Sequence, residues 1–462
     1  MARTFHIRTF GCQMNEHDSE RLAGLLVADG LEPTDDVAAA DVVVFNTCCI
    51  RENADNKFYG ELGRLKAVTD LRPGVQIAVG GCLAQKDRDL VRRRAGHVDV
   101  VFGTHNLERA PALLRQAATA GPVVEILEQG ASDEAAGSAL TAVREAEHSA
   151  WVTIQVGCDN SCAFCIVPQV RGKEVSRPLD DLVGEVEVLA GRGVSEVTLL
   201  GQNVNSYGRD LTRRHPLFAE LLRAVGGVAG IRRVRFTSPH PKDLRPETIA
   251  AMAETPAVCE HLHLPLQSGS DRVLAAMRRG YRAERYLERL AAARRAVDDL
   301  AVTTDIIVGF PGETEDDFAA TLEVAAEAAY DSAYTFVFSP RPGTRAAAMV
   351  DDFVPDVVVA ERFERLRVVV ERSALARHQA RVGRLEEVLV EGPSKRDPDV
   401  CSGRTRQHKL VHFAPSPDEE LPPGSYAAVR VTKAAPHHLL GELDHVLSTP
   451  ARRRIPVALR RP

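Results

Sequence analysis

The sequence predicts an α/β protein of three domains: a parallel-sheet domain, an open barrel and a small closed β-barrel. Two stretches, up to about residue 118 and from about 150 to 375, alternate short apolar runs with amphipathic segments, which is typical of parallel sheets covered by helices. From residue 381 to 447, short β-rich runs are separated by Pro, Gly and Ser turns, as in small barrels. A chain of 462 residues is long enough for two or three hydrophobic cores.

The first stretch predicts a Rossmann-like domain over residues 3–119. Its apolar runs alternate with the period of strands, and the segments between them have helical spacing. We expect strands at Thr4–Phe10, Asp41–Phe45 and Gln76–Val79, and helices at Glu16–Ala28 and Glu52–Lys66. Residues 119–149 are rich in Ala, Gly and Glu and are predicted to be a linker with one short hairpin arm.

The second stretch predicts a partial (β/α)6 barrel over residues 144–375. The expected strands are Trp151–Val156, Glu196–Leu200, Arg233–Thr237, His261–Leu264, Val302–Val308 and Tyr334–Phe338. Amphipathic helices are expected between them, for example at Asp180–Ala190, Ala283–Val297 and Thr314–Ala328, and Glu361–Gln379 is expected to lead out of the domain as a long helix. In such barrels the reactive face lies at the carboxyl ends of the strands.

The third stretch predicts an oligonucleotide-binding type of β-barrel over residues 378–447. Its expected strands are Glu386–Glu391, Lys409–Phe413, Tyr426–Thr432 and Glu442–Val446. The chain as a whole has a net charge of −6, which argues against non-specific coating of nucleic acid. From Arg377 to Pro462, however, 15 Lys and Arg stand against 10 Asp and Glu, so this end offers a surface for a polyanion.

Composition places the chain in a reducing compartment. Hydrophobic residues make up 44% and charged residues 26%, and no apolar run is long enough to span a membrane. Nine cysteines are few for a disulfide scaffold and odd in number, so clustered ones are expected to be metal ligands or catalytic groups. We expect a cytoplasmic monomer with no membrane partner.

Cys158, Cys162 and Cys165 form a C-x3-C-x2-C loop directly after a predicted strand. Three thiolates at this spacing can hold three irons of a [4Fe–4S] cluster and leave the fourth iron open to a small chelating molecule. The competing interpretations are a zinc knuckle that lacks its fourth ligand and three buried structural cysteines. Structural zinc prefers four ligands at a different spacing, which favours the iron–sulfur cluster.

This spacing resembles that of the radical S-adenosylmethionine superfamily. The resemblance implies that the open iron holds the amino and carboxylate groups of S-adenosylmethionine, whose reduction gives a 5′-deoxyadenosyl radical. Phe164 occupies the aromatic place before the last cysteine of the loop. The turn Gly309-Phe310-Pro311-Gly312-Glu313 resembles the glycine-rich edge that lets a backbone approach the cofactor.

Polar or turn residues follow several predicted barrel strands and are candidates to bind S-adenosylmethionine. Side chains at these strand ends could hydrogen-bond the methionine and ribose of the cofactor. The alternative for each is an ordinary helix cap or turn. The candidates are Gln202, Asn203, Gln267, Ser268, Gly309 and Pro311, with Ser238-Pro239-His240 at a further strand end.

Cys12, Cys48 and Cys82 each follow a strand of the first domain. Because the carboxyl ends of parallel strands meet at one edge of the sheet, these cysteines are expected to be neighbours in space. Any one of them taken alone could be a buried structural cysteine. Together they predict a second three-cysteine cluster.

The three domains together resemble the methylthiotransferase family, whose carboxy-terminal barrel is of the TRAM type. The resemblance covers nearly the whole chain, and four motifs resemble the branch that acts on N6-(dimethylallyl)adenosine in tRNA. They are Gly11-Cys12-Gln13-Met14-Asn15, Cys49-Ile50-Arg51-Glu52, Arg171-Gly172-Lys173-Glu174-Val175-Ser176-Arg177-Pro178 and Gly201-Gln202-Asn203-Val204-Asn205. Two positions depart from the family: Cys49 stands where serine is usual, and Asp159 adds a negative charge to the cluster loop.

A basic turn in the third domain is the predicted RNA contact. Arg404, Arg406 and Lys409 lie in Gly403-Arg404-Thr405-Arg406-Gln407-His408-Lys409, and cations on a small barrel suit a phosphate backbone. On its own the turn could be a solvated charge run, and the resemblance to TRAM domains favours tRNA. Arg452–Arg454 and Arg460–Arg461 form a basic tail that could add non-specific affinity.

The resulting hypothesis is an enzyme that adds a methylthio group to carbon 2 of the modified adenosine beside the anticodon. It implies two [4Fe–4S] clusters, S-adenosylmethionine as radical source and methyl donor, and an external electron donor. One alternative is a methylthiotransferase for a ribosomal-protein aspartate or for threonylcarbamoyl-adenosine of tRNA. An alternative of another class is a non-catalytic iron–sulfur electron carrier with an RNA-binding tail.

Overall fold

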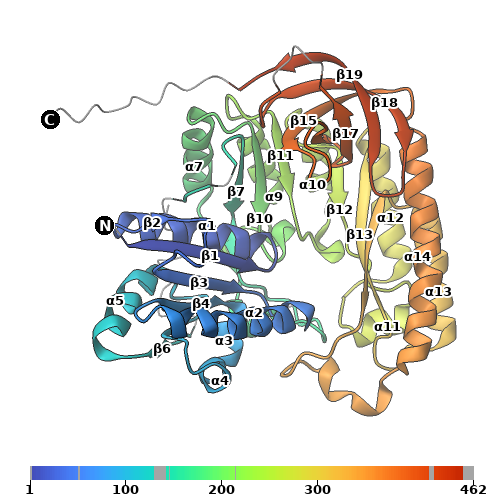
Figure 1. The fold of residues 1–462 in the computed structure, drawn as a ribbon. Helices are drawn as coiled ribbons and strands as arrows, with labels where there is room; N and C mark the ends of the chain where they lie inside the picture. Colours follow the sequence, from blue (N-terminus) through green and yellow to red (C-terminus); the bar gives the residue numbers. More distant parts are fainter. Residues whose placement is uncertain are drawn as a thin grey trace.

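The computed structural model describes residues 3–49, 52–128, 142–144, 146–213, 215–415 and 421–450. Within them the chain forms the three predicted domains, and the predicted fold class is confirmed (Figure 1). Ile50 and Arg51, most of the predicted hairpin arm and the basic tail from Arg452 onward lie outside the described residues. Among the described helices, none combines the length and apolar composition needed to cross a membrane.

The N-terminal domain is a six-stranded parallel sheet in the order β2-β1-β3-β4-β5-β6. Its strands are β1 Thr4–Phe10, β2 Glu32–Pro33, β3 Val42–Thr47, β4 Gln76–Gly81, β5 Val100–Phe102 and β6 Val123–Glu125. Its helices are α1 Gln13–Ala28, α2 Glu52–Leu71, α3 Cys82–Asp87, α4 Asp89–Arg94 and α5 Ala110–Ala120, with a 3-10 turn η1 at Leu107–Arg109. Strands β2, β5 and β6 are too short to give a periodic signal in the sequence.

The side chains of β3 alternate between the two faces of this sheet, and each face has its own core. Val42 and Val44 pack in the cluster that includes residues of α1 and α5. Val43 and Phe45 pack in the cluster that includes residues of α2, α3 and α4. A strand that is buried on both faces has a continuous run of apolar residues, which explains why Asp41–Phe45 shows no alternation of polar and apolar residues after its first position.

The central domain carries six parallel strands in two groups of three, β7-β10-β11 and β12-β13-β14. A parallel bridge from Val234 to Val258 connects the groups, so the strands form the predicted open barrel. The strands are β7 Ser149–Thr153, β10 Glu196–Leu200, β11 Arg233–Phe236, β12 His261–His263, β13 Ala301–Val308 and β14 Ser332–Val337. The short strands β8 Gln155–Val156 and β9 Val175–Ser176 pair antiparallel beside them.

Helices cover the outside of these strands and enclose one large apolar core. They are α6 Val167–Arg171, α7 Leu179–Gly191, α8 Arg209–Thr212, α9 Phe218–Gly226, α10 Pro246–Glu254, α11 Asp271–Ala276, α12 Ala283–Ala296 and α13 Glu315–Ala328. Short 3-10 turns are η2 Val204–Ser206, η3 Pro241–Asp243, η4 Ala346–Ala348 and η5 Val350–Asp352. The predicted exit helix is α14, Asp356–Gln379, which runs along the central domain to the third domain (Figure 1).

The third domain is a closed barrel in the order β15-β16-β17-β19-β18. Gly403 in β16 is the position where a side chain would prevent closure, because a Cβ there would lie 2.4 Å from the carbonyl oxygen of Leu389. The strands are β15 Leu385–Pro393, β16 Cys401–Thr405, β17 Leu410–Ala414, β18 Tyr426–Ala434 and β19 Leu439–Ser448. The sequence pattern did not indicate β16.

The C-terminal barrel docks on the amino-terminal end of the central strands. Arg233, the first residue of β11, donates hydrogen bonds to the backbone oxygens of Arg404 and Glu387 at 2.9 and 3.0 Å. Lys409 forms an ion pair of 2.7 Å with Asp331, just before β14, and both side chains are buried. The turn between β16 and β17 therefore closes the end of the open barrel that lies opposite the expected reactive face.

Lys409→Met should undock the C-terminal barrel, because it leaves the carboxylate of Asp331 buried without its cation. Loss of one partner of a buried pair costs about 3–5 kcal/mol. Arg430→Met is the matched control, since its pair with Asp444 is exposed and removal should cost no more than about 1 kcal/mol. Urea unfolding of the two variants measures both effects, and equal losses would contradict the docking role of Lys409.

The N-terminal and central domains also meet through buried polar contacts. His17 of α1 lies 2.7 Å, Nδ1 to Oγ1, from Thr153 at the end of β7. Burial, with a smaller contribution from the nearby Arg21, lowers the pKa of His17 to about 3. The imidazole is therefore neutral in the folded protein and serves as an uncharged hydrogen-bonding group at the domain interface.

His17→Gln should flatten the acid side of the stability profile. In the unfolded chain His17 becomes protonated below about pH 6.5, whereas in the folded chain it stays neutral down to about pH 3. The stability that the neutral imidazole contributes is therefore fully present above about pH 6.5. As pH falls from there toward 3, the free energy of unfolding decreases by up to roughly 1.4 kcal/mol per pH unit. Urea midpoints measured from pH 7.5 to 4.5 test this, and parallel curves for variant and wild type would refute it.

Candidate active site

The cysteine loop of the central domain begins at Gly157, directly after β8. Gly157 has a positive φ of 85°, and a Cβ at this position would lie 1.8 Å from the carbonyl oxygen of Lys173. Cys158 then donates its backbone N–H to the oxygen of Gly172 at 3.0 Å. The loop is thus fastened to the segment before β9, and glycine is needed because the two backbones approach so closely.

The three thiols of this loop lie in a dry environment with one buried cation. Burial raises the pKa of Cys158 to about 11 and that of Cys165 to about 12. Arg279, itself buried, donates from Nη1 to the sulfur of Cys162 at 3.3 Å. Three thiols beside a fixed guanidinium suit an anionic iron–sulfur cluster, whose binding would release the thiol protons.

Sequence reasoning missed Arg279. Burial acts to lower its pKa, but Tyr281 and Cys162 raise it above the usual range, so the group stays charged. Its position, three residues after the end of α11 and far along the chain from the cysteines, carries no motif. Only the tertiary structure brings its guanidinium to the cluster loop.

Three amide side chains beside the loop have buried polar atoms without a partner among the described residues: Gln155 Oε1, Gln202 Nε2 and Asn203 Oδ1. Gln202 accepts the backbone N–H of Gly157 at 2.5 Å through its other atom, Oε1. Asn203 donates to Asp243 at 2.9 Å. Buried polar atoms are rarely left unpaired in proteins, so these atoms fit a ligand with polar groups of its own.

The other predicted cofactor contacts are engaged within the protein. Ser268 is fully buried and its hydroxyl lies 3.2 Å from that of Thr321. Gln267 has a positive φ of 67°, and its backbone pairs with β13. Gly309 also has a positive φ, of 76°, and the space beside it is filled by Val359 of α14.

The glycine turn therefore has a packing role. Gly309 donates its N–H to Glu313 at 2.9 Å, and Glu313 is paired with Arg362 of α14 at 3.0 Å. Pro311, between them, is buried. The turn is held against α14, and its glycine is required by that contact as well as by its backbone conformation.

The second cysteine set lies at the carboxyl ends of neighbouring strands, as expected. Cys12 follows β1, Cys48 follows β3 and Cys82 follows β4. Cys48 donates its N–H to the oxygen of Phe10 at 2.7 Å, which holds the first two strand ends together. At Gly81, φ is 92° and a Cβ would lie 2.5 Å from Asn46 Oδ1, so a larger residue would displace Cys82.

Cys12 and Cys82 ionise more readily than Cys158 and Cys165 of the loop. A hydrogen bond from Cys48 lowers the pKa of Cys12 to about 6, and Arg171 contributes to the shift. A hydrogen bond from Cys49 lowers the pKa of Cys82 to about 7, again with a contribution from Arg171. Thiolates beside a buried guanidinium fit an iron–sulfur cluster, and Cys49 is a fourth thiol in the same pocket.

Arg171 links the two cysteine sets. It ends α6, the helix that follows the cysteine loop, and forms an ion pair of 2.7 Å with Asp18 of α1. Ile166 and Val170 of the same segment pack in the core of the N-terminal domain. The segment after one cysteine set is thereby built into the domain that carries the other.

No three His, Cys, Asp or Glu side chains of the described segments converge on a single-ion site. Each thiolate of an iron–sulfur cluster binds a different iron, so its ligands do not need such convergence. The two cysteine trios are therefore compatible with such clusters.

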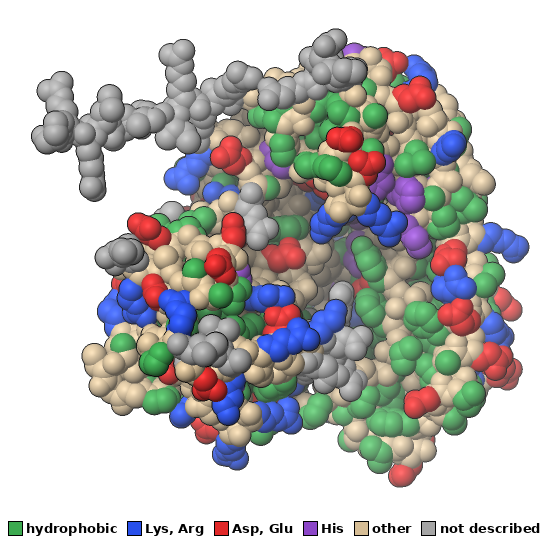
Figure 2. All heavy atoms as spheres, in the orientation of Figure 1, with side chains coloured by type: hydrophobic (Ala, Val, Ile, Leu, Met, Phe, Trp, Pro, Cys, Tyr) green, Lys and Arg blue, Asp and Glu red, His purple; other side chains and the backbone are tan. Residues whose placement is uncertain are grey.

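The predicted RNA contacts face inward for the most part. Arg406 forms a 2.7 Å ion pair with Glu260, and Lys409 is buried against Asp331. Arg404 keeps about a third of its side chain exposed and pairs with Glu391 at 3.0 Å. Two of the three cations therefore connect the barrel to the central domain. Other Lys and Arg side chains rim the hollow between the domains (Figure 2).

Comparison with known families divides the chain as its fold does. Residues 152–325 match the radical SAM superfamily, residues 4–103 match the Uncharacterized protein family UPF0004, and residues 379–443 match the TRAM domain. The matched ranges lie within or close to the predicted domain limits, whose outer residues stay a prediction.

Solved structures resemble about three quarters of this chain in fold at low sequence identity. The radical S-adenosylmethionine methyltransferase TsrM from Kitasatospora setae has a TM-score of 0.55 and 13% identity, with 75% of each chain covered. The cobalamin-dependent S-adenosylmethionine radical enzyme OxsB has a TM-score of 0.51 and 10% identity, over 79% of this chain and 56% of that one. These similarities concern the fold alone.

Curated relatives are much closer and extend over nearly the whole chain. The tRNA-2-methylthio-N(6)-dimethylallyladenosine synthase of Acidothermus cellulolyticus is 55% identical, over 95% of this chain and 88% of the relative. That of Nocardia farcinica is also 55% identical, over 96% and 89%. At this identity over nearly the whole of both chains, the chain belongs to the tRNA-2-methylthio-N(6)-dimethylallyladenosine synthase family, a family of radical S-adenosylmethionine enzymes.

Proposed function

We propose that this enzyme adds a methylthio group to carbon 2 of N6-(dimethylallyl)adenosine next to the anticodon of tRNA. The observation that carries the proposal is the pair of three-cysteine sets held on either side of α6 and Arg171. One set supports radical chemistry and the other supports sulfur delivery. The relatives' name supplies the substrate.

The proposed ligands are Cys158, Cys162 and Cys165 for a first [4Fe–4S] cluster and Cys12, Cys48 and Cys82 for a second. When bound, the first cluster with S-adenosylmethionine supplies a carbon radical that removes hydrogen from the base, and the second supplies the sulfur. A carbon–hydrogen bond of this kind is beyond ordinary acid–base chemistry.

The protein's own groups bind and orient these partners. Gln202 and Asn203, with their unpartnered amide atoms, are proposed to hydrogen-bond S-adenosylmethionine. The other predicted cofactor contacts are proposed to hold the site in shape, because their contacts are made within the protein. They are Gln267, Ser268, Gly309 and Pro311.

The tRNA is proposed to span both ends of the central domain. The C-terminal barrel lies at the amino ends of the strands, and Arg404 is the member of its basic turn that keeps a partly exposed guanidinium. Arg406 and Lys409 would support RNA binding by fixing the barrel in place. We also propose an external electron donor, a monomer, and a cytoplasmic location alongside the tRNA substrate.

The alternatives are less well supported. Both relatives reported above are named as synthases for dimethylallyladenosine, which disfavours a ribosomal-protein aspartate or threonylcarbamoyl-adenosine as the substrate. A non-catalytic electron carrier is disfavoured because the chain belongs to a family of enzymes. Each cysteine trio would also leave one iron open.

Nucleoside mass analysis tests the reaction directly. We expect tRNA from a strain that lacks the gene to carry N6-(dimethylallyl)adenosine without the methylthio group, and the plasmid-borne gene to restore that group. Persistence of the methylthio nucleoside in the deletion strain would refute the assignment.

Iron content tests the proposed number of clusters. Anaerobically reconstituted protein should hold about eight irons, and replacing either cysteine trio with Ala should leave about four. Cys259→Ala is the matched control, because this buried cysteine belongs to neither set. An iron content of about four in the wild type would refute the second cluster.

Arg279→Met should make the reduction potential of the first cluster more negative. A unit positive charge within several Å stabilises the reduced cluster by about 2 kcal/mol at an effective dielectric constant of about 20, which is on the order of 100 mV. Redox titration followed by electron paramagnetic resonance measures the shift. Arg279→Lys should recover most of it, and Arg278→Met, at the exposed neighbouring position, should leave the potential unchanged. Equal potentials in wild type and Arg279→Met would contradict this role.

A further inference from the structure

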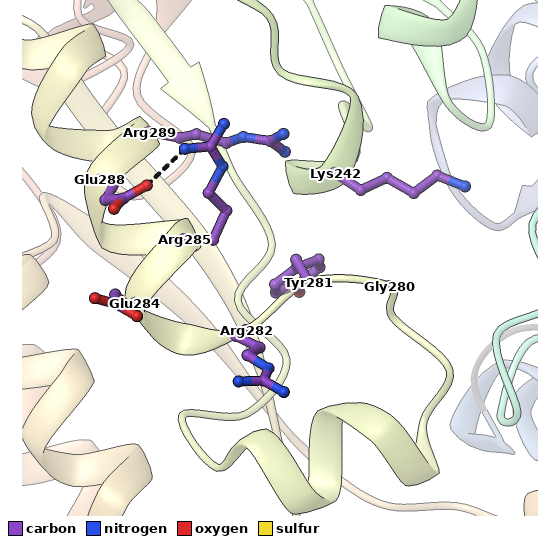
Figure 3. A pocket seen from close by; sticks show the side chains of 8 residues that line it. All are labelled: Lys242, Gly280, Tyr281, Arg282, Glu284, Arg285, Glu288 and Arg289. Carbon is purple, nitrogen blue, oxygen red and sulfur yellow. Dashed lines mark hydrogen bonds and ion pairs between the residues drawn. The ribbon is translucent and has the colours of Figure 1, made fainter.

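A cavity of about 310 Å³ lies beside the cysteine loop, between the start of α12 and the turn η3 (Figure 3). None of the functions described above uses it. Its lining residues are Lys242, Gly280, Tyr281, Arg282, Glu284, Arg285, Glu288 and Arg289.

The lining is cationic. Four of the eight residues are Lys or Arg and two are Glu, and one of these, Glu288, is neutralised by Arg285 at 2.6 Å. Figure 3 shows Glu284 and Glu288 on the side of α12 away from Lys242, whereas Arg282 and Arg289 extend toward the side of Lys242 and Gly280. The cavity therefore presents more positive than negative charge.

Three of these cations, Lys242, Arg282 and Arg289, form no ion pair with a carboxylate in the part of the chain that the structure describes. Arg289 donates to the backbone oxygen of Pro241, and the exposed guanidinium of Arg282 has no hydrogen-bond partner among the described residues. Burial lowers the pKa of Arg289, and the neighbouring Arg285 lowers it further. An anion bound beside Arg285 and Arg289 would reduce the repulsion between their two positive charges.

The cavity is connected to the cluster loop by one direct hydrogen bond and by a second path that passes through Arg279. Lys242 donates from Nζ to the side chain of Asn160, which lies between Cys158 and Cys162. On the other wall, Tyr281 lies 3.3 Å from Arg279, the residue that contacts Cys162. An anion in the cavity would thus lie next to the reactive end of the barrel.

The direction of α12 adds to the attraction for an anion. The helix begins at Ala283 and runs for 14 residues, so its partly positive amino end faces the cavity. The N–H of Ala283 is already donated to the carboxylate of Asp271 at 2.8 Å, so the guanidinium groups of the cavity are the groups that would bind a phosphate. The chemistry of the cavity therefore matches a phosphate group.

We propose that this cavity binds a backbone phosphate of the substrate RNA, adjacent to the nucleotide that enters the active site. The inference rests on the proposed function, since it takes tRNA to be the substrate. An RNA strand whose base reaches the cluster loop carries its phosphates past the rim of the same site. The cavity cations then hold the strand while the C-terminal barrel holds the body of the tRNA.

The test compares two arginines of one helix. Arg282 at the start of α12 lines the cavity, and Arg295 in its last turn is exposed and lies outside it. The two are about 20 Å apart along the helix. Binding of tRNA that carries N6-(dimethylallyl)adenosine is measured with reconstituted full-length enzyme at several salt concentrations, for Arg282→Ala, Arg282→Lys, Arg282→Glu and Arg295→Ala.

Loss of one phosphate contact lowers the slope of log affinity against log salt by about 0.7–0.9. The ratio of wild-type to Arg282→Ala affinity for tRNA should therefore be on the order of threefold larger at about 50 mM salt than at about 200 mM salt. Arg282→Lys should keep the wild-type slope, Arg282→Glu should bind more weakly still, and Arg295→Ala should match the wild type.

Equal affinities and slopes for Arg282→Ala, Arg282→Glu and wild type would overturn the proposal. It would also be overturned if Arg282→Ala impaired S-adenosylmethionine cleavage without RNA while tRNA binding stayed normal, because the cavity would then serve the cofactor. Methylthio formation by the wild type is measured in the same series. Its absence would refute the proposed function, whatever the binding slopes show.

Discussion

The buried ion pair between Arg171 and Asp18 is the contact on which the arrangement of the active site depends. Arg171 comes from the central domain, directly after the cysteine loop, and Asp18 from the first helix of the N-terminal domain. Separating the domains would leave a buried charge without its partner, which is strongly unfavourable. Because Ile166 and Val170 pack in the N-terminal core, apolar burial and charge pairing both oppose that separation. The two cysteine sets are thereby kept on the same side of the molecule.

The two sets nevertheless differ in their electrostatics. Cys158 and Cys165 of the loop have a raised pKa because burial disfavours their charged form. Cys12 and Cys82 have a lowered pKa because Cys48 and Cys49 donate hydrogen bonds to them and Arg171 lies near both. In the proposed reaction one site has to start a radical and the other to hand over sulfur. A single fold gives two environments because each set is surrounded by different groups.

The cations of the C-terminal barrel show how a charge motif can be misread. Arg406 and Lys409 look like an RNA contact in the sequence, yet both are paired with carboxylates of the central domain. A cation can attach a barrel to its own chain as readily as to a phosphate, and the sequence does not distinguish these uses. The carboxylates that decide between them, Glu260 and Asp331, lie far away along the chain.

The sequence by itself determined the three domains, most of their strands and the position of each cysteine set, because these depend on local periodicity and on short spacings. It did not indicate β5, β16 or the packing role of Gly309, which depend on partners such as Leu389 and Val359. It also did not reveal Arg279, Arg171 or the cavity at α12 as parts of one site. Only the tertiary structure decided these features, because each depends on side chains distant in sequence that meet after the chain has folded.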